Sequence, residues 1–397
     1  MAPEHTAITA NHSPYDVGFG IYVHWPFCLA KCPYCDFNSH VRHQKVDADS
    51  FTAGLGRELH HLARQTPDRQ VTSVFFGGGT PSLMPPHCVE QVIRTIDDLW
   101  DVAGDVEITL EANPTSIEAK NFTGYHSAGV NRVSVGVQAL VDDDLKRLGR
   151  QHSVDEALSA FKLASKTFAR TSFDLIYARP GQTVQAWRSE LERALAEQCG
   201  HMSLYQLTIE PQTAFEGLWK SGKLVVPNDD LAAALFDVTQ ELTDKAGLPA
   251  YEISNHAAAG QQSRHNLLYW QYGEYGGVGA GAHSRLLTNN GGRLALSTEK
   301  NPERWLSLVN KTGSGIVETE GLTMADQARE FLLMGLRLRQ GIELQRYERL
   351  FGKRLCHEQI FSLADQNFIS HDKKRGTIAA TRSGAAVLNS LIMLLAD

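Results

Sequence analysis

The chain has 397 residues, 42% of them hydrophobic, and a formal net charge of −7. A chain of this length can bury a large core, and we expect one large domain and a small one. The negative balance and the absence of a lysine- or arginine-rich stripe argue against a nucleic-acid-binding protein. The N-terminus has no basic region followed by an apolar one, so no signal peptide is predicted.

No apolar run reaches the roughly 18 residues that a membrane-spanning helix needs. The apolar stretch AAVLNSLIMLL, near the C-terminus, predicts an amphipathic packing helix with at most peripheral membrane contact. Three scattered cysteines, Cys88, Cys199 and Cys356, have apolar or helical neighbours and are predicted to be buried free thiols. Free thiols suit a reducing compartment, so we expect a soluble, cytoplasmic protein.

Strand and helix patterns alternate regularly between residues 20 and 208. Strands are predicted at 20–24, 71–76, 106–110, 133–137, 172–177 and 202–208. Helical patterns are predicted between them, at 47–65, around 89–99, from 114, at 153–168 and at 184–197. This alternation indicates parallel βαβ units, and six units suggest an incomplete (β/α)6 barrel, an α/β fold. Active sites of such barrels gather at the carboxyl ends of the strands.

The loop after the first predicted strand holds three cysteines within eight positions, Cys28, Cys32 and Cys35. Three thiolates on one short loop can hold three irons of a [4Fe–4S] cluster. No fourth cysteine is near, so one iron would keep an open position. An open iron beside a bound sulfonium is what the reductive cleavage of S-adenosylmethionine requires.

Two other interpretations of the cysteine spacing remain open at this point. The spacing also fits the apolar stripe of a helix, although Pro26 and Pro33 interrupt the segment and proline is costly inside a helix. A zinc site with His24 or His40 as the fourth ligand is the second alternative. Zinc modules usually present their ligands as two pairs, whereas this segment has one triplet.

The string YVHWPFCLAKCPYC, residues 22–35, closely resembles the cluster motif of the radical S-adenosylmethionine (radical SAM) superfamily. Over nearly its whole length the chain resembles the oxygen-independent coproporphyrinogen III dehydrogenase (oxidase) family, with its HemW-type haem-chaperone branch. The resemblance implies a partial barrel that binds a [4Fe–4S] cluster and S-adenosylmethionine. In one respect the chain departs from the dehydrogenases: they have a further cysteine two places after the last cluster ligand, where this chain has Phe37.

The glycine-rich segment 77–81 follows a predicted strand and lacks the Lys-Ser/Thr of a phosphate-binding loop. Glycines let a ligand approach the backbone, and in the family this loop contacts the methionyl amino group of S-adenosylmethionine. The resemblance implies cofactor contacts at the matching positions, which are Tyr22, Tyr34, Gly78, Gly79, Thr80, Glu111, Gln138, Arg150, Asp174 and Thr208. The planar guanidinium of Arg150 suits a carboxylate. Each polar residue alone could be a structural hydrogen-bonder, but Glu111, Gln138 and Asp174 are expected at successive strand ends.

A second motif, HNLLYW at residues 265–270, matches the H-N-x-x-Y-W haem-binding motif of the HemW branch. The resemblance implies haem contacts at His265, Asn266, Tyr269 and Trp270. Histidine is a good axial ligand of haem iron, and aromatic rings can cover a porphyrin face. The alternative is a packed histidine beside an aromatic cluster. The later GVGAG, residues 277–281, lacks the preceding strand and the acidic residue of a dinucleotide site, so we expect it to line the site structurally.

The pattern changes after the barrel. An amphipathic helix with a glycine cap is predicted at 230–246, and residues 251–255 and 265–284 are expected to run back toward the barrel. The last part, with helices at 325–338, 345–351 and near 358, a β pair at 368–370 and 377–379 and a final helix, suggests a winged-helix-like α+β domain. The predicted organisation is a flexible lead (1–18), the barrel (19–255), a connecting segment lining the site (256–322) and a HemN-type C-terminal domain (323–397).

Two functions are compatible with these observations. The first is a haem chaperone that binds haem and a [4Fe–4S] cluster with S-adenosylmethionine, and passes haem to acceptor proteins. The second is an oxygen-independent coproporphyrinogen III dehydrogenase, which decarboxylates two propionates by radical chemistry. Phe37, the short lead and the H-N-x-x-Y-W match favour the chaperone. A radical enzyme acting on RNA is a third interpretation, which the negative charge disfavours. A homodimer is compatible with the sequence.

Overall fold

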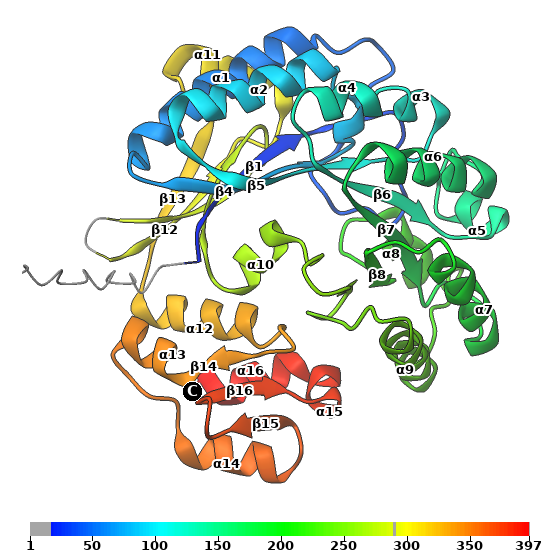
Figure 1. The fold of residues 1–397 in the computed structure, drawn as a ribbon, viewed down its shortest axis with the longest axis vertical. Coiled ribbons are helices and arrows are strands. Elements are labelled where there is room, and N and C mark those ends of the chain that lie inside the picture. The colour runs from blue at the N-terminus through cyan, green and yellow to red at the C-terminus, as the bar shows by residue number, and fades with distance from the viewer. Residues whose placement is uncertain (1–16, 289–290, 397) are drawn as a thin grey trace, which may run out of the picture.

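The structure, a computed structural model, describes residues 17–288 and 291–396. In these ranges, one curved sheet of eleven strands carries helices on its outer face (Figure 1). Its core strands are β1 Phe19–Trp25, β4 Gln70–Gly78, β5 Asp101–Ala112, β6 Arg132–Gln138, β7 Arg170–Tyr177 and β8 His201–Gln206. These six strands are neighbours in that order, and each adjacent pair is parallel. The predicted partial barrel of six units is confirmed. Residues 1–16 of the predicted lead lie outside the described residues.

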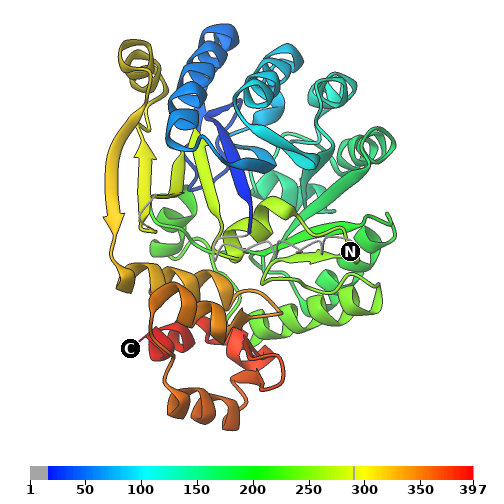
Figure 2. The same ribbon diagram turned by 60° about the vertical axis from the view of Figure 1, so that its left-hand side comes forward.

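Helices that follow the core strands cover the outer face of the sheet (Figures 1 and 2). The main ones are α1 Ala48–Gln65, α2 Pro86–Leu99, α4 Phe122–Ser127, α6 Val154–Thr167 and α7 Val184–Leu195. Shorter turns of helix are η1 Pro81–Leu83, α3 Ser116–Ala119 and α5 Asp142–Arg147. A capping box of Ser153 and Glu156 is present at the start of α6, where it satisfies backbone N–H groups that have no partner within the helix.

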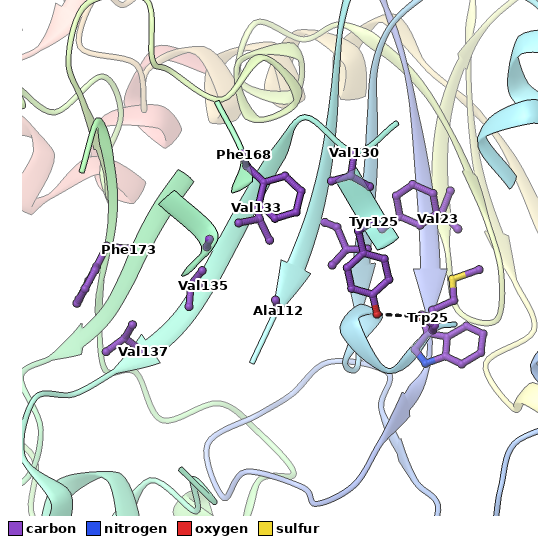
Figure 3. Packing of buried hydrophobic residues seen from close by; sticks show 14 of the residues in the cluster. Val23, Trp25, Ala112, Tyr125, Val130, Val133, Val135, Val137, Phe168 and Phe173 are labelled. Carbon is purple, nitrogen blue, oxygen red and sulfur yellow. Dashed lines mark hydrogen bonds between the residues drawn. The ribbon is translucent and has the colours of Figure 1, made fainter. Parts of the chain in front are cut away.

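Every second side chain of a strand points to the same face of the sheet, and this alternation determines which side chains face the helices. Val133, Val135 and Val137 of β6 lie in the buried core between the sheet and the helices (Figure 3). Because successive side chains of a strand point to opposite faces, Ser134 and Gln138 face the concave interior. The concave interior therefore receives polar side chains, while the apolar face holds the helices.

Other strands extend both edges of this parallel core. On one side β10 Glu274–Val278 lies parallel to β1, followed by antiparallel β11 His283–Leu287, β12 Arg293–Thr298 and β13 Ile316–Leu322. On the other side β9 Asn255–Ala257 pairs with β8. The predicted return of the chain toward the barrel is confirmed, because β10 joins β1. Helix α10, Arg264–Trp270, lies on the concave side of the sheet (Figure 1). The remaining elements before residue 323 are β2 Phe27–Cys28, β3 His40–Val41, α8 Ala214–Lys220, α9 Asp229–Lys245 and α11 Pro302–Thr312.

The C-terminal part has its own hydrophobic cluster. Its elements are α12 Met324–Gly335, β14 Ile342–Glu343, α13 Leu344–Phe351, α14 His357–Asp365, β15 Ile369–Asp372, β16 Thr377–Ala380, α15 Arg382–Ala386 and α16 Leu388–Ala396. The predicted β pair is β15 and β16, and β14 adds a short strand that the sequence did not predict. None of the helices in the described ranges combines the length and apolarity needed to cross a bilayer. The boundaries predicted for the lead, the barrel, the connecting segment and the C-terminal domain stay predictions.

All six cysteines are free. Cys88 and Cys199 are buried, as predicted. The prediction for Cys356 is wrong, because this residue precedes α14 at its N-cap, where the side chain is exposed.

Two glycines of α1 give a matched test of the outer layer. A Cβ on Gly56 would meet no atom within 4 Å, whereas one on Gly54 would lie 2.9 Å from Leu306 Cδ1 and 3.0 Å from Trp305 Cη2. We expect Gly56→Ala to raise the free energy of unfolding by about 0.5–1 kcal/mol, because alanine loses less backbone entropy in a helix. Gly54→Ala should lower it, because the Trp305 ring is fully buried and cannot move aside. Chemical denaturation followed by circular dichroism measures both, and equal shifts would contradict the packing of α11 on α1.

Candidate cluster and S-adenosylmethionine site

The three cysteines lie in the loop that leaves the carboxyl end of β1. Cys28 ends the short strand β2, and the Cys35 N–H donates to the Cys32 carbonyl at 3.1 Å in a turn. The loop is non-helical, so the helical-stripe alternative is wrong. Backbone hydrogen bonds anchor it, since Gly79 N–H donates to Trp25 O at 2.7 Å and Phe215 N–H to Pro33 O at 2.9 Å.

Each cysteine sulfur has a polar neighbour from a different part of the chain. Thr80 Oγ1 donates to Cys28 Sγ at 3.3 Å, and Arg150 Nη1 donates to Cys32 Sγ at 3.5 Å. Ser39 Oγ lies 4.0 Å from Cys35 Sγ. Burial raises the pKa of the Cys28 thiol to about 11, and the two other cysteines add to this rise as neighbouring negative charges. Bound metal would offset that cost, because the thiolate is the form that ligates.

The geometry distinguishes a cluster from a lone zinc ion. Zinc–sulfur bonds of about 2.3 Å bring tetrahedral ligand atoms to within about 4 Å of one another. Among the described residues, the three sulfurs do not form a ligand group within 4.8 Å, with or without a histidine. A [4Fe–4S] cluster takes each thiolate on a different iron, so it suits more widely spaced sulfurs.

The two candidate fourth ligands of zinc have other partners. His24 Nδ1 lies 3.1 Å from the Tyr22 hydroxyl, and its Nε2 lies 2.9 Å from Asn38 O. His40 Nε2 lies 3.1 Å from Lys300 O. The donor set therefore fits a [4Fe–4S] cluster and does not fit the zinc alternative.

The first glycine-rich segment passes directly against the cluster loop. A Cβ on Gly78, where φ is +116°, would lie 2.8 Å from Trp25 O. A Cβ on Gly79 would lie 2.9 Å from Cys28 Sγ. Only glycine fits at these two positions. The close approach of the two segments places Thr80 within hydrogen-bonding distance of the Cys28 sulfur.

The second glycine-rich segment packs on the same loop. A Cβ on Gly279 would lie 2.3 Å from His24 O, and one on Gly281 would lie 2.3 Å from Asn38 Nδ2. Asn38 Nδ2 also donates to Ala280 O at 2.8 Å. The segment thus supports the cluster loop structurally, and Asn38, which the sequence did not single out, connects the two.

Arg150 lies beside the cluster loop. Its Nη2 donates to Asn113 Oδ1 at 2.5 Å and to Gly136 O at 3.2 Å. Asn113 Nδ2 donates to Thr80 Oγ1 at 3.4 Å, so the contacts of Cys28 and Cys32 are joined through one amide. Sequence reasoning missed Asn113, although its place immediately after β5 was a usable signal. The charge of Arg150 also acts on the Tyr34 hydroxyl, whose pKa burial raises, so both residues lie at this loop.

The acidic and amide residues occupy the concave face. Burial and the Asp174 carboxylate raise the pKa of Glu111 to about 8, which places the two groups near each other. Asp174 accepts hydrogen bonds from Ser134 at 2.8 Å and Ser172 at 2.7 Å. Gln138 ends β6 with a φ of +69°, and its buried Oε1 has no hydrogen-bond partner in the part of the chain that the structure describes. An unsatisfied buried oxygen at this edge fits a polar ligand.

Two placements differ from the prediction. Asp174 lies in the middle of β7, so it is not at a strand end. β8 ends at Gln206, and Thr208 follows it as an exposed residue whose hydroxyl donates to Glu210 at 2.8 Å. The described contacts of Thr208 include none of the other predicted cofactor residues.

The raised pKa of Glu111 predicts a pH-dependent stability of the cofactor-free protein. The unfolded carboxyl titrates near pH 4.3, so its protonated form stabilises the folded state below that pH, and this contribution is lost as the pH rises through about 8. Between pH 5 and pH 8 we expect the free energy of unfolding to fall by about 1–3 kcal/mol more in wild type than in Glu111→Gln. Denaturation curves at these two pH values measure the difference. Parallel losses in both proteins would show that Glu111 titrates normally.

The H-N-x-x-Y-W segment forms helix α10, which packs on strands β4 and β1. His265 is 1% exposed, and its Nδ1 lies 2.8 Å from Ser73 Oγ while its Nε2 lies 2.8 Å from the Tyr269 hydroxyl. Burial lowers the pKa of His265 to about 3, so the ring is neutral. In this arrangement both nitrogens are engaged, as the packed-histidine alternative describes. Ser73 lies six residues before Gly79, which is about 20 Å along an extended strand. The His265 ring also stacks on that of Tyr22, with centroids 6.5 Å apart, and the Tyr22 hydroxyl lies 3.1 Å from His24 Nδ1.

The other residues of the motif face different neighbours. Asn266 and Trp270 are partly buried, and the Trp270 Nε1 has no hydrogen-bond partner among the described residues. The Arg337 guanidinium lies 5.5 Å from the Trp270 ring, so α10 reaches the C-terminal part of the chain.

Comparisons with known proteins agree with this geometry. The profile of the Radical SAM superfamily matches residues 22–194, and that of the HemN C-terminal domain matches residues 322–385. The fold is similar to that of coproporphyrinogen III oxidase (HemN) from Escherichia coli, with a TM-score of 0.79 over 97% of this chain and 91% of that one at 20% identity. The heme chaperone HemW of Haemophilus influenzae is 36% identical over 94% of this chain and 97% of its own length. The mitochondrial radical S-adenosyl methionine domain-containing protein 1 of Bos taurus is 37% identical over 94% of this chain and 86% of its own. The resemblance seen in the sequence is confirmed, and the chain belongs to the HemW family of the radical SAM superfamily.

Proposed function

We propose that this protein is a haem chaperone, which binds haem and a [4Fe–4S] cluster with S-adenosylmethionine and passes the haem to acceptor proteins. The observation that carries the proposal is the likeness, over 94% of the chain, to proteins named heme chaperone HemW in H. influenzae and E. coli. Phe37, at the position where the dehydrogenases have a cysteine, supports the same choice.

Cys28, Cys32 and Cys35 would hold the cluster, which supplies an open iron for the amino acid part of S-adenosylmethionine and an electron for its sulfonium. Hydrogen bonds from Thr80 and Arg150 to two of the sulfurs stabilise the thiolates, and such bonds help to set a cluster's reduction potential.

The polar residues near the loop suit the two charged ends of that amino acid part. Gly78 and Gly79 leave the backbone open to close approach, and Arg150 offers a planar cation for a carboxylate. Glu111 suits the ammonium group, whose positive charge favours the ionised carboxylate and lowers the pKa of Glu111. Tyr22, Tyr34, Gln138 and Asp174 complete the proposed contacts.

Haem contact is assigned to the segment 265–270. In the described arrangement the Tyr269 hydroxyl covers the Nε2 of His265, so iron ligation by His265 requires that hydroxyl to move away. Trp270 lies at the boundary with the C-terminal part, and its indole N–H, which has no partner within residues 17–288 and 291–396, suits a haem propionate. The predicted homodimer and cytoplasmic location stay predictions, and several animal relatives are named mitochondrial.

Because the fold is similar to that of HemN, the second candidate function of this protein is that of a coproporphyrinogen III dehydrogenase. One experiment separates the two: cluster-loaded protein is titrated with haem and is assayed in parallel for coproporphyrinogen III turnover with S-adenosylmethionine and a reductant. We expect saturable haem binding without porphyrinogen decarboxylation. Turnover without haem binding would reverse the assignment.

A further inference from the structure

A second group of potential metal ligands lies where helices α1 and α2 begin. Asp49 is the second residue of α1, and His87 and Cys88 are the second and third residues of α2. Asp49 Oδ1 lies 2.8 Å from His87 Nε2, Cys88 Sγ lies 3.3 Å from the same nitrogen, and Cys88 Sγ lies 3.6 Å from Asp49 Oδ1. Among the described residues, these three form a group of potential metal ligands whose ligand atoms all lie within 4.8 Å of one another.

The arrangement differs from a hydrogen-bonded catalytic relay. In a Cys–His–Asp relay the two ring nitrogens of the histidine face different partners, one the nucleophile and the other the carboxylate. Here the thiol and the carboxylate both meet Nε2 of His87. In the metal-free structure the three groups are hydrogen-bonded to one another, and the Cys88 thiol donates to Asp49. Once the thiol and the ring nitrogen release their protons, three electron pairs face one point, which is the arrangement that a cation stabilises.

The ligand types match a borderline-soft divalent ion, and so do the two distances to Cys88 Sγ, 3.3 and 3.6 Å. The 2.8 Å between Asp49 Oδ1 and His87 Nε2 is a hydrogen-bond length, which must widen when an ion binds. Zinc binds thiolate, imidazole and carboxylate with bonds of about 2.0–2.3 Å, which put tetrahedral ligand atoms roughly 3.3–3.8 Å apart. The N-termini of α1 and α2 favour the ionised carboxylate and thiolate, the forms that ligate. Burial raises the pKa of the Cys88 thiol in the metal-free protein, and a bound cation would offset that cost. One thiolate and one carboxylate neutralise a divalent ion, so the bound site places no net charge at the two helix ends.

Two further observations point to a ligand here. Thr52, one turn after Asp49 on α1, is 1% exposed, and among the described residues its Oγ1 makes no hydrogen bond other than a weak one with the Cys88 thiol. That hydroxyl lies close enough to Cys88 to act on its thiol. Asp49 and His87 also line a cavity of about 560 Å³ that Cys28 borders, so a fourth ligand can enter from that side.

We propose that Asp49, His87 and Cys88 bind one divalent transition-metal ion, for which Zn²⁺ is the probe, with a fourth position open to the cavity beside the cluster loop. Such an ion joins the first turns of α1 and α2 at the edge of the proposed cluster site. The site is separate from the three cluster cysteines, because its three ligands all come from the two helices.

Anaerobic, cluster-loaded protein, equilibrated with Zn²⁺ and freed of unbound metal, tests this site by its zinc and iron contents. We expect about one zinc per chain in wild type, and at least tenfold less bound zinc at the same free concentration in Cys88→Ser and in His87→Ala. Iron should stay unchanged in both variants. Cys356→Ser and His60→Ala, which alter exposed residues elsewhere, are the matched controls and should keep the zinc.

X-ray absorption at the zinc edge gives an independent reading, with one sulfur at about 2.3 Å and lighter ligands near 2.0–2.1 Å. Because the Cys88 thiol is buried, Cys88→Ser is the variant most prone to misfold. Asp49→Asn changes a solvent-exposed carboxylate and is therefore the third site variant. Zinc that persists in the folded site variants would overturn the proposal. So would zinc that displaces iron, since it would then occupy the cluster cysteines, and so would wild-type protein that takes up none.

Discussion

Replacing Cys32 with alanine is expected to reduce the iron bound after anaerobic reconstitution from about four atoms per chain to less than one. Only three thiolates are offered to the cluster, so the variant leaves two irons without a protein ligand. The change also removes the sulfur that accepts from Arg150 Nη1 at 3.5 Å and leaves that charge beside the loop. Cys32 is only partly buried, so the fold should survive, as circular dichroism can check. Iron and sulfide analysis with visible absorption measures the result.

Cys356→Ser is the control for this loss, because it removes an exposed thiol far along the chain. It should keep about four irons and a spectrum that changes when S-adenosylmethionine is added. Four irons in Cys32→Ala would remove this residue from the ligand set. A wild-type preparation that holds zinc alone and ignores S-adenosylmethionine would refute the cluster itself.

His265→Ala is expected to abolish stable haem binding and to lower the free energy of unfolding by about 2–4 kcal/mol. The stability loss has a direct cause, since the change leaves Ser73 Oγ and the Tyr269 hydroxyl buried without their partner, at about 1–3 kcal/mol each. The stacked Phe75 ring, whose centroid lies 5.1 Å from that of His265, also loses its contact. Haem titration and denaturation measure the two effects, and cluster iron should be unchanged.

Tyr269→Phe separates ligation from packing. It removes one hydrogen bond and leaves the Nε2 of His265 uncovered, with a stability cost of about 1 kcal/mol. If His265 ligates iron, haem binding should be kept or strengthened in this variant while it is lost in His265→Ala. If both variants bind haem as wild type does, His265 is a packing residue and the haem site lies elsewhere.

Periodicity predicted the barrel because each βα unit is a local pattern. The strand predicted at 71–76 is β4 Gln70–Gly78, and the helix predicted at 47–65 is α1 Ala48–Gln65. Ends of strands were less predictable, because pairing with a neighbour decides where a strand stops. β8 therefore ends before Thr208, and the polar Asp174 is accommodated inside β7 by serines of three strands.

The sequence by itself determined the cysteine triplet, the glycines beside it and the family, because ligand type and spacing on one loop depend on neighbouring positions. Only the tertiary structure decided that His265 is enclosed by Ser73, 192 residues away, and that Asp49 meets Cys88 across 39 residues. Contacts between distant segments follow from how strands pair and helices pack, and no local pattern records them. The same reason explains why Asn38, which connects the cluster loop to the second glycine-rich segment, was found only in the folded chain.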